Sequence, residues 1–171
     1  MFWGSKVKWL ALLLILFPLQ SLACLKNCKA DRDSLRLITS FEGFSPFVYK
    51  DIVGIDTVGF GHALKPGEHF PEPMTGDEAQ TLLESDVALF QAGINRLVKA
   101  DLTKNRFAAL LDYTFNLGVY TLQKSSVLAY VNAKRHKEVP SRLILYDRAG
   151  GRVSNGLLRR REAEGTLYIT P

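Results

Sequence analysis

The chain has 171 residues, of which 47% are hydrophobic and 23% are charged. This length is enough for one domain with a hydrophobic core, and the sequence contains no repeat or low-complexity run, which excludes repetitive and fibrous proteins. The net charge of +5 suits a polyanionic partner, such as nucleic acid, a membrane surface or bacterial cell wall, but it is equally compatible with no specific partner.

The first 23 residues have the pattern of an export signal. Two lysines give a basic start, residues 9–19 form an apolar run, and small residues stand at positions −3 and −1 of a cleavage site after Ala23. The apolar run is shorter than the roughly 20 residues that span a bilayer. We therefore expect a signal peptide or a signal anchor over residues 1–23, with lipid attachment at Cys24 as a third alternative. Loss of this segment would lower the net charge from +5 to +3, since it holds two basic and no acidic residues.

The sequence contains two cysteines, Cys24 and Cys28. In an oxidising compartment they can pair, and the loop that they close is so short that the bond would stabilise the fold only weakly. They make a poor zinc site because the three histidines lie far away in the sequence. We expect no metal and no cofactor, and we expect residues 24–32 to form a polar linker in front of one domain over residues 33–171.

The domain is predicted to begin with a helix over residues 33–42. Asp33 is a typical N-cap residue, and apolar residues follow at helical spacing from Leu35 to Phe41. Gly43 can adopt the left-handed conformation that ends a helix. Glu42 therefore belongs to the last helical turn.

A small sheet is predicted after this helix. Residues 44–63 contain short segments rich in β-branched and aromatic residues, with Gly54 between them. We predict an antiparallel sheet of two or three strands. Residues 64–73 contain three prolines and must form a loop.

The rest of the chain is predicted to be helical. Thr75 and Glu78 form a capping box in front of one long helix that reaches about Val98. Further helices are expected from Phe107 to near Gly118, over residues 121–135, and over residues 137–147 with Pro140 in the first turn. After a loop over residues 149–156, a last helix is expected at the C-terminus, with Asn155 as its cap. The fold class is therefore α+β, with a small antiparallel sheet near the N-terminus, a mainly helical second lobe and a cleft between the two lobes.

Two carboxyl groups lie near the point where the predicted helix is followed by the predicted sheet: Glu42 at the end of the helix and Asp51 in the sheet region. The negative end of the helix dipole and the neighbouring Phe41 and Phe44 would raise the pKa of Glu42 and keep it protonated. Asp51 lies in a wetter turn and would stay ionised. An acid and a base of this kind form the site of a glycoside hydrolase, in which Thr57 could share a water molecule with Asp51. The alternative is that these residues only form turns and a solvated helix end.

The pattern E-x8-D-x5-T-x-G-x-G-H is formed by Glu42, Asp51, Thr57, Gly59, Gly61 and His62. It resembles the phage lysozyme family, the endolysin muramidases of the T-even and lambdoid phages. Three later segments also resemble the family: MTGDEAQTLLESD, FAALLDYTFNLG and AGGRVSNGLLRRREAE. The similarity covers roughly residues 34–168.

The resemblance implies a lysozyme-like fold and hydrolysis of the β-1,4 bond between N-acetylmuramic acid and N-acetylglucosamine in peptidoglycan. Glu42 would be the general acid that protonates the leaving oxygen, and Asp51 and Thr57 would position and activate the attacking water, with inversion. A nucleophile-like role of Asp51 stays open, because the distance between the carboxyl groups decides the stereochemistry. Related phage transglycosylases cleave without water, but the aspartate and threonine at these spacings argue for hydrolysis.

The resemblance also suggests residues that contact or support the substrate. His62 would support Glu42 or a nearby salt bridge. Asn116 would either bond a sugar N-acetyl group or cap a helix end, and Ser125 or Ser126 would line the cleft.

Two features of the C-terminal part are interpreted as structural. The R-R-R run over residues 159–161 is interpreted as a solvated helix face that pairs with Glu162 and Glu164. Tyr146 stands where many relatives have a tryptophan, and we expect this exchange of one aromatic residue for another to preserve packing.

The sequence favours an exported enzyme whose partner is the glycan of peptidoglycan. A nucleotide site is poorly supported because GFGHAL lacks the third glycine of the dinucleotide motif, and no basic surface with interleaved aromatic residues points to nucleic acid. We expect a monomer in the periplasm or the extracellular space, with membrane contact if the leader is retained. The competing function is a non-catalytic cell-wall-binding domain of lysozyme fold, against which the intact Glu42, Asp51 and Thr57 argue.

Overall fold

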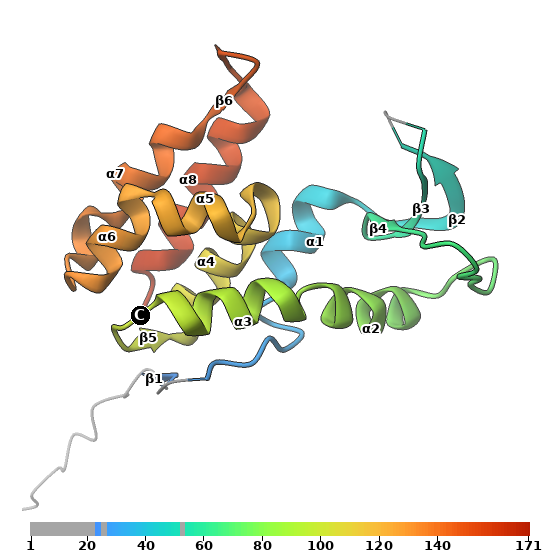
Figure 1. Ribbon diagram of the computed structural model, residues 1–171, viewed down its shortest axis with the longest axis horizontal. Helices are drawn as coiled ribbons and strands as arrows, with labels where there is room; N and C mark the ends of the chain where they lie inside the picture. Colours follow the sequence, from blue (N-terminus) through green and yellow to red (C-terminus); the bar gives the residue numbers. More distant parts are fainter. Residues whose placement is uncertain (1–22, 25–26, 52–53) are drawn as a thin grey trace, which may run out of the picture.

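The computed structural model describes residues 23–24, 27–51 and 54–171 of the chain (Figure 1). The predicted leader lies outside these residues, except for its last position. Across the described part, no helix combines the length and the apolar character that are needed to cross a membrane.

The first helix, α1 (Arg36–Glu42), begins later than predicted. The prediction that Asp33 caps it is wrong, because the turn in front of the helix is closed by Asp31, whose Oδ1 accepts the N–H of Ser34 at 2.9 Å. Gly43 has a φ of 74° and ends the helix, as predicted. Glu42, the last residue of α1, therefore lies directly in front of the sheet, which begins at Ser45.

A three-stranded antiparallel sheet follows, as predicted. Its strands, in the order β2-β3-β4, are β2 (Ser45–Lys50), β3 (Asp56–Gly59) and β4 (His62–Ala63). Tyr49 pairs with Thr57 in the register of β2 and β3, and Gly54, with a φ of 85°, lies in the turn between them. The loop predicted over residues 64–73 is confirmed. The sheet contributes to a small core of its own, formed by Val58, Met74 and Ala79.

Two helices replace the single long helix that was predicted after this loop. Helix α2 (Gly76–Asp86) has the predicted capping box between Thr75 and Glu78, and helix α3 (Ala88–Leu97) continues along nearly the same line (Figure 1). They are separated at Val87, whose ψ is −9° and whose N–H is shared between two carbonyl oxygens of the preceding turn. The apolar periodicity continues across Val87, so the pattern did not reveal this break.

The helical lobe is built around α4 (Lys104–Leu117), which ends at Gly118 as predicted. The other elements of this lobe are α5 (Val119–Lys124), α6 (Ser126–Asn132), α7 (Val139–Leu143), α8 (Asn155–Ile169) and the 3-10 turns η1 (His136–Glu138) and η2 (Ile144–Tyr146). The prediction of one helix over residues 121–135 is wrong, because Ser125 interrupts it and caps α6. Pro140 lies in the first turn of α7, as predicted.

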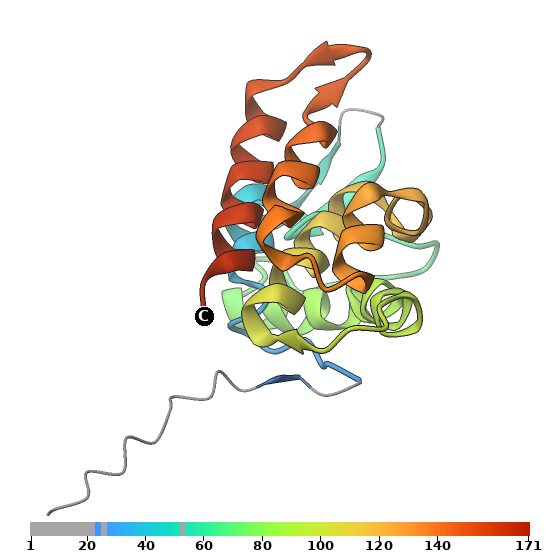
Figure 2. The ribbon, with the colours of Figure 1, turned by 90° about the vertical axis from the view of Figure 1, so that its left-hand side faces the viewer.

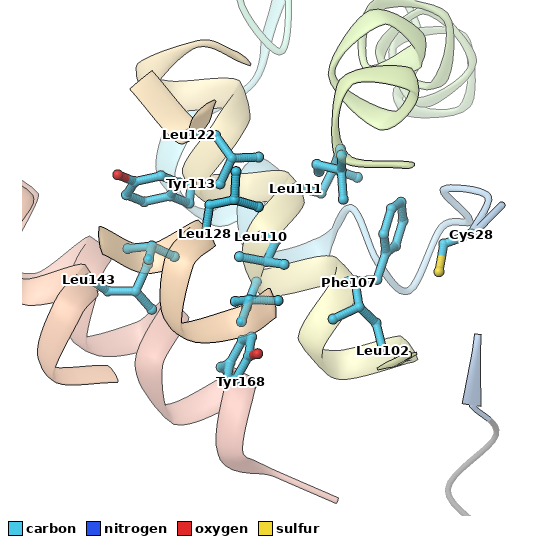
Figure 3. Packing of buried hydrophobic residues seen from close by; sticks show 14 of the residues in the cluster. Cys28, Leu102, Phe107, Leu110, Leu111, Tyr113, Leu122, Leu128, Leu143 and Tyr168 are labelled. Carbon is cyan, nitrogen blue, oxygen red and sulfur yellow. The ribbon is translucent and has the colours of Figure 1, made fainter. Parts of the chain in front are cut away.

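The core of the helical lobe surrounds α4, whose residues from Phe107 to Thr114 are all buried. Figure 3 shows how neighbouring helices meet α4 in this core through Leu122 of α5, Leu128 of α6, Leu143 of α7 and Tyr168 of α8. Tyr146 packs edge-on against Tyr113, with 5.4 Å between the ring centres. Because α8 lies directly on α4, any polar side chain on the contact face of α8 must find a partner within the core.

The segment predicted as a linker packs on the helical lobe where it is described. Strand β1 (Ala23–Cys24) pairs antiparallel with β5 (Leu102–Thr103). Cys28 is disulfide-bonded and buried in the core that contains Phe107 (Figure 3). Its carbonyl oxygen accepts a hydrogen bond from Asn95 Nδ2 of α3 at 3.0 Å.

A short hairpin occupies part of the predicted loop over residues 149–156. Strands β6 (Arg148–Ala149) and β7 (Arg152–Val153) pair antiparallel on either side of Gly150 and Gly151, which have φ values of 56° and 78°. The prediction that Asn155 caps α8 is wrong, because the side chain of Ser154 does so. Figures 1 and 2 show that this hairpin and the β2–β3 hairpin extend from the same side of the molecule.

The turn after α6 contains a residue in an unfavourable conformation. Lys134 has a φ of 57°, and Arg135 donates its N–H to the carbonyl oxygen of Tyr130 at 2.9 Å, as in a helix end that requires a left-handed residue. A side chain at this position costs roughly 1 kcal/mol, which glycine avoids while losing more chain entropy on folding. We expect Lys134→Gly to raise the free energy of unfolding by about 0.5–1 kcal/mol in urea denaturation.

Lys137→Gly is the matched control for this prediction. Lys137 lies in η1, and its φ is not positive. Glycine at this position should therefore leave the stability unchanged or lower it. Equal effects of the two substitutions would contradict the explanation given for Lys134.

Candidate active site

Glu42 is the last residue of α1, and its side chain is 27% exposed. Nη1 of Arg160 donates a hydrogen bond to Glu42 Oε1 at 2.7 Å. The neighbouring Phe41 and Phe44 are 36% and 45% exposed, so they enclose the carboxyl group less than the sequence suggested. The cation that contacts this carboxyl group, Arg160, was not expected from the sequence.

Arg160 is held from the other side by Asp112 of α4. Its Nε donates to Asp112 Oδ2 at 2.9 Å and its Nη2 to Oδ1 at 2.8 Å, and Asp112 is fully buried. Burial alone would lower the pKa of Arg160, but the hydrogen bonds and charges of Asp112 and Glu42 raise it above its ordinary value. This guanidinium is therefore a permanent cation that joins α1, α4 and α8.

Asp51 and Thr57 meet at the turn between β2 and β3. The backbone N–H of Asp51 and the hydroxyl of Thr57 both donate to the carbonyl oxygen of Ile55, at 2.9 Å and 3.1 Å. Asp51 Oδ1 in turn accepts the N–H of Ile55 at 2.8 Å. Thr57 is buried, and Asp51 is half-buried. The structure thus brings together the two residues that were predicted to position a water molecule.

His62 is buried between two carboxyl groups. Its Nδ1 lies 2.9 Å from each carboxyl oxygen of Asp86, and its Nε2 lies 3.0 Å from Glu68 Oε2. The ring also meets Phe70 edge-on, with 5.4 Å between ring centres. Both ring nitrogens are occupied, so His62 ties β4 to α2 and to the following loop and offers no nitrogen to a sugar. A salt bridge was one of the two roles that the resemblance suggested for it.

These contacts make the stability of the fold depend on pH. Burial lowers the pKa of His62, but the hydrogen bonds and charges of Glu68 and Asp86 outweigh burial and raise the pKa above its ordinary value of about 6.5. The resulting stabilisation is complete below about pH 6.5 and is lost as the pH rises through the folded-state pKa, because the folded state binds this proton more tightly. We expect the free energy of unfolding to fall above about pH 6.5, by about 1.4 kcal/mol for each unit by which the pKa is raised.

Glu68→Gln isolates this effect. The N–H of Lys65 and the ring of His62 lower the pKa of Glu68 to about 2, so the titration of Glu68 itself lies far below the range of interest. Urea unfolding at about pH 6 and about pH 8.5 should show a smaller loss of stability in the variant than in the wild type. Losses of the same size in both proteins would rule out His62 as the source.

Asn116 and Ser125 are engaged in contacts within the helical lobe. Asn116 Oδ1 accepts a hydrogen bond from Arg161 Nη2 at 2.9 Å. Ser125 is 5% exposed, and its Oγ accepts the N–H of Leu128 at 3.1 Å and donates to the carbonyl oxygen of Leu122 at 2.8 Å. Ser125 therefore serves as the buried N-cap of α6, and its hydroxyl does not line an open surface. Contact of Asn116 with a sugar stays a prediction.

The three arginines of the R-R-R run differ in burial. Arg159 is exposed, whereas Arg160 and Arg161 are buried. Arg161 pairs with Glu164 at 2.7 Å. Burial and the neighbouring carboxyl group of Asp112 raise the pKa of Glu164 above its ordinary value, and the charge of Arg161 opposes this. The interpretation of the run as a solvated helix face is wrong for two of its members, because α8 packs that face on α4.

The sequence interpretation missed Arg160 and Asp112 as site residues. Asp112 stands alone among apolar residues in the segment FAALLDYTF, a pattern that indicates a buried and paired charge. The buried face of α8 repeats through Arg161, Glu164 and Tyr168 at helical spacing. Hydrophobic periodicity overlooks this stripe because two of these three residues are charged.

Within residues 23–24, 27–51 and 54–171, no group of three or more histidine, cysteine, aspartate or glutamate residues is placed to hold a metal ion. The site is instead organised by a guanidinium and by backbone N–H groups.

Comparison with known proteins identifies the family. The phage lysozyme family matches residues 39–164, a range that includes Glu42, Asp51, Thr57, Asp112 and Arg160. This chain belongs to the phage lysozyme family. The lysozyme-like α+β fold that was predicted from the sequence is thereby confirmed.

The relatives of this chain differ in the share of their own length that the chain covers. The endolysin of Bacillus phage B103 is 35% identical over 138 residues, which make up 80% of this chain and 52% of that endolysin. The SAR-endolysin of Enterobacteria phage P21 is 34% identical over 128 residues, 75% of this chain and 77% of that protein. The muramidase domain of SpmX from Asticaccaulis excentricus has a TM-score of 0.74 and 31% identity, and the match covers 84% of this chain and 99% of that domain. The chain thus spans about half the length of the Bacillus phage endolysin but nearly all of the solved muramidase domain.

Proposed function

We propose that this phage lysozyme is an endolysin that hydrolyses the β-1,4 bond between N-acetylmuramic acid and N-acetylglucosamine in peptidoglycan. The observation that carries the proposal is the set of Glu42 at the end of α1 and Asp51 with Thr57 at the neighbouring turn, in a chain of the phage lysozyme family. The names of the relatives, endolysin and muramidase domain, support it.

The proposed reaction divides the work between two carboxyl groups. Glu42 donates its proton to the glycosidic oxygen while the bond between that oxygen and C1 of the sugar breaks. A water molecule positioned by Asp51 and Thr57 adds its oxygen to C1, and the carboxylate of Asp51 accepts the released proton. Attack from the opposite face inverts the configuration at C1, whereas direct attack by Asp51 would retain it. The cleft predicted between the lobes would hold the glycan strand.

We propose that the protein is exported and acts on the wall as a monomer. The leader over residues 1–23 supports export, because its basic start, apolar run and small residues follow the signal pattern. The disulfide bond at Cys28 suits an oxidising compartment. Relatives named SAR-endolysin cover much of the chain. Intact-mass measurement of the exported protein distinguishes a cleaved leader from a retained one that would keep the domain over residues 33–171 at the membrane.

Digestion of purified peptidoglycan tests this function. We expect the protein to lower the turbidity of a wall suspension and to release reducing ends in proportion. Binding to the wall with no loss of turbidity would support the competing reading, a non-catalytic wall-binding domain of lysozyme fold. An absence of both binding and cleavage, with and without the leader, would overturn the proposal.

A further inference from the structure

A buried carboxylate reaches the proposed acid through one guanidinium. Asp112 lies in the middle of α4, and its side chain is 0% exposed, so it touches no substrate. Arg160 of α8 contacts Asp112 with two nitrogen atoms and Glu42 of α1 with the third. These three residues are separated by 48 and 118 positions in the sequence, and only the folded chain brings them together.

We propose that Asp112 is a positioning residue for Glu42 and acts through Arg160, whose guanidinium it holds in place and whose charge it offsets. This inference rests on the function proposed above. It gives Arg160, a member of the R-R-R run, a part in the reaction that was not expected from the sequence.

The contacts of Arg160 fix the direction of its guanidinium. A guanidinium is planar, and its donors form a rigid fork. Once Nε and Nη2 are bound to the two oxygens of Asp112 at 2.9 Å and 2.8 Å, the direction of Nη1 is fixed as well. Nη1 then meets Glu42 at 2.7 Å, and the ring of Phe41 lies 5.3 Å from Arg160 Cζ. The carboxyl group that must donate a proton is therefore held by a side chain that is itself held from the core.

The charge of Arg160 acts on the proton that Glu42 must donate. A general acid must keep its proton until the substrate takes it, but a neighbouring cation favours loss of that proton. Asp112 supplies the compensating negative charge on the far side of Arg160. Two further ionisable groups lie beside Asp112: Arg161, whose charge acts on it, and Glu164, which pairs with Arg161 at 2.7 Å.

Asp112→Asn tests the proposal because it preserves shape while removing the charge. We expect kcat on soluble glycan strands to fall about tenfold, since the fork on Arg160 loses one of its two anchors. KM should stay within about twofold, because Asp112 does not touch the substrate. The alkaline limb of the pH–activity profile should move to lower pH, since Asp112 then no longer offsets the positive charge of Arg160. A variant that merely loosens the core would not move this limb.

Glu164→Gln is the matched control. It makes the same exchange of carboxyl for amide at another fully buried position beside Asp112. Because Glu164 pairs with Arg161, whereas Arg160 binds Asp112 and Glu42, this change should leave the alkaline limb where it is in the wild type. Movement of the limb in both variants, or in neither, would overturn the proposal.

Arg160→Lys decides the matter if Asp112→Asn does not fold. Lysine keeps the charge, but its single nitrogen cannot hold both oxygens of Asp112 and also reach Glu42. We expect kcat to fall about tenfold with an unchanged alkaline limb, while full kcat would refute the holding role. A wild-type chain with no activity would remove the proposed function and this inference together, whereas an active wild type with normal variants would remove the inference alone.

Discussion

Replacing Glu42 by glutamine should lower the rate of glycan hydrolysis by about 10²–10⁴-fold, the range that a general acid contributes. Glutamine has nearly the shape of glutamate, and its oxygen can still accept the hydrogen bond that Arg160 makes at 2.7 Å. The amide has no proton of suitable acidity to give to the leaving oxygen. The release of reducing ends from purified peptidoglycan, at equal concentrations of folded protein, measures this difference.

Glu162→Gln provides the control for this substitution. Glu162 is an exposed glutamate on α8, so the same chemical change at this position should leave the rate close to that of the wild type. Retention of the wild-type rate in Glu42→Gln would show that Glu42 is not the acid. Similar losses in both variants would show that the assay does not report on the site.

Replacing Arg161 by alanine should destabilise the fold by about 3 kcal/mol or more. Arg161 is fully buried, pairs with Glu164 at 2.7 Å and bonds Asn116 at 2.9 Å. Its guanidinium also lies 5.1 Å from the ring centre of Tyr113. Alanine removes these contacts and leaves a cavity between α8 and α4. The midpoint of urea denaturation measures the loss.

Arg159→Ala is the comparison from the same run of three arginines. Arg159 is exposed, and truncation at such a position usually changes stability by less than about 0.5 kcal/mol. The difference between the two variants therefore reports the burial and the contacts of Arg161, since the residue type and the helix are the same. Equal stabilities would contradict the packing of α8 on α4 described here.

Features of the fold that depend on neighbouring residues were predictable. The end of α1 at Gly43, the turn at Gly54 and the capping box of Thr75 and Glu78 each arise from a few adjacent positions. The break at Val87 was not predictable, because the apolar stripe of α2 continues into α3 and no glycine or proline stands next to Val87. Hydrophobic periodicity identifies the buried side of a helix, but it does not locate a single residue at which the helix is interrupted.

The candidate site was predictable in the segment from Glu42 to Thr57 and not beyond it. Asp51 and Thr57 lie close in the sequence, and their shared contact with Ile55 follows from a tight turn. The partners of Arg160 lie 48 and 118 positions away, so adjacent residues carry no sign of them. For this reason three consecutive arginines, which look alike in the sequence, occupy three different environments.

The products of peptidoglycan digestion show whether the chain cleaves the glycan by hydrolysis. Hydrolysis by Glu42 with Asp51 and Thr57 predicts fragments that end in a reducing N-acetylmuramic acid, which mass spectrometry after borohydride reduction identifies. These fragments should form with the wild type and be almost absent with Glu42→Gln. Fragments that end in anhydro-muramic acid, lighter by one water, would show that no water is added and would contradict the roles assigned to Asp51 and Thr57.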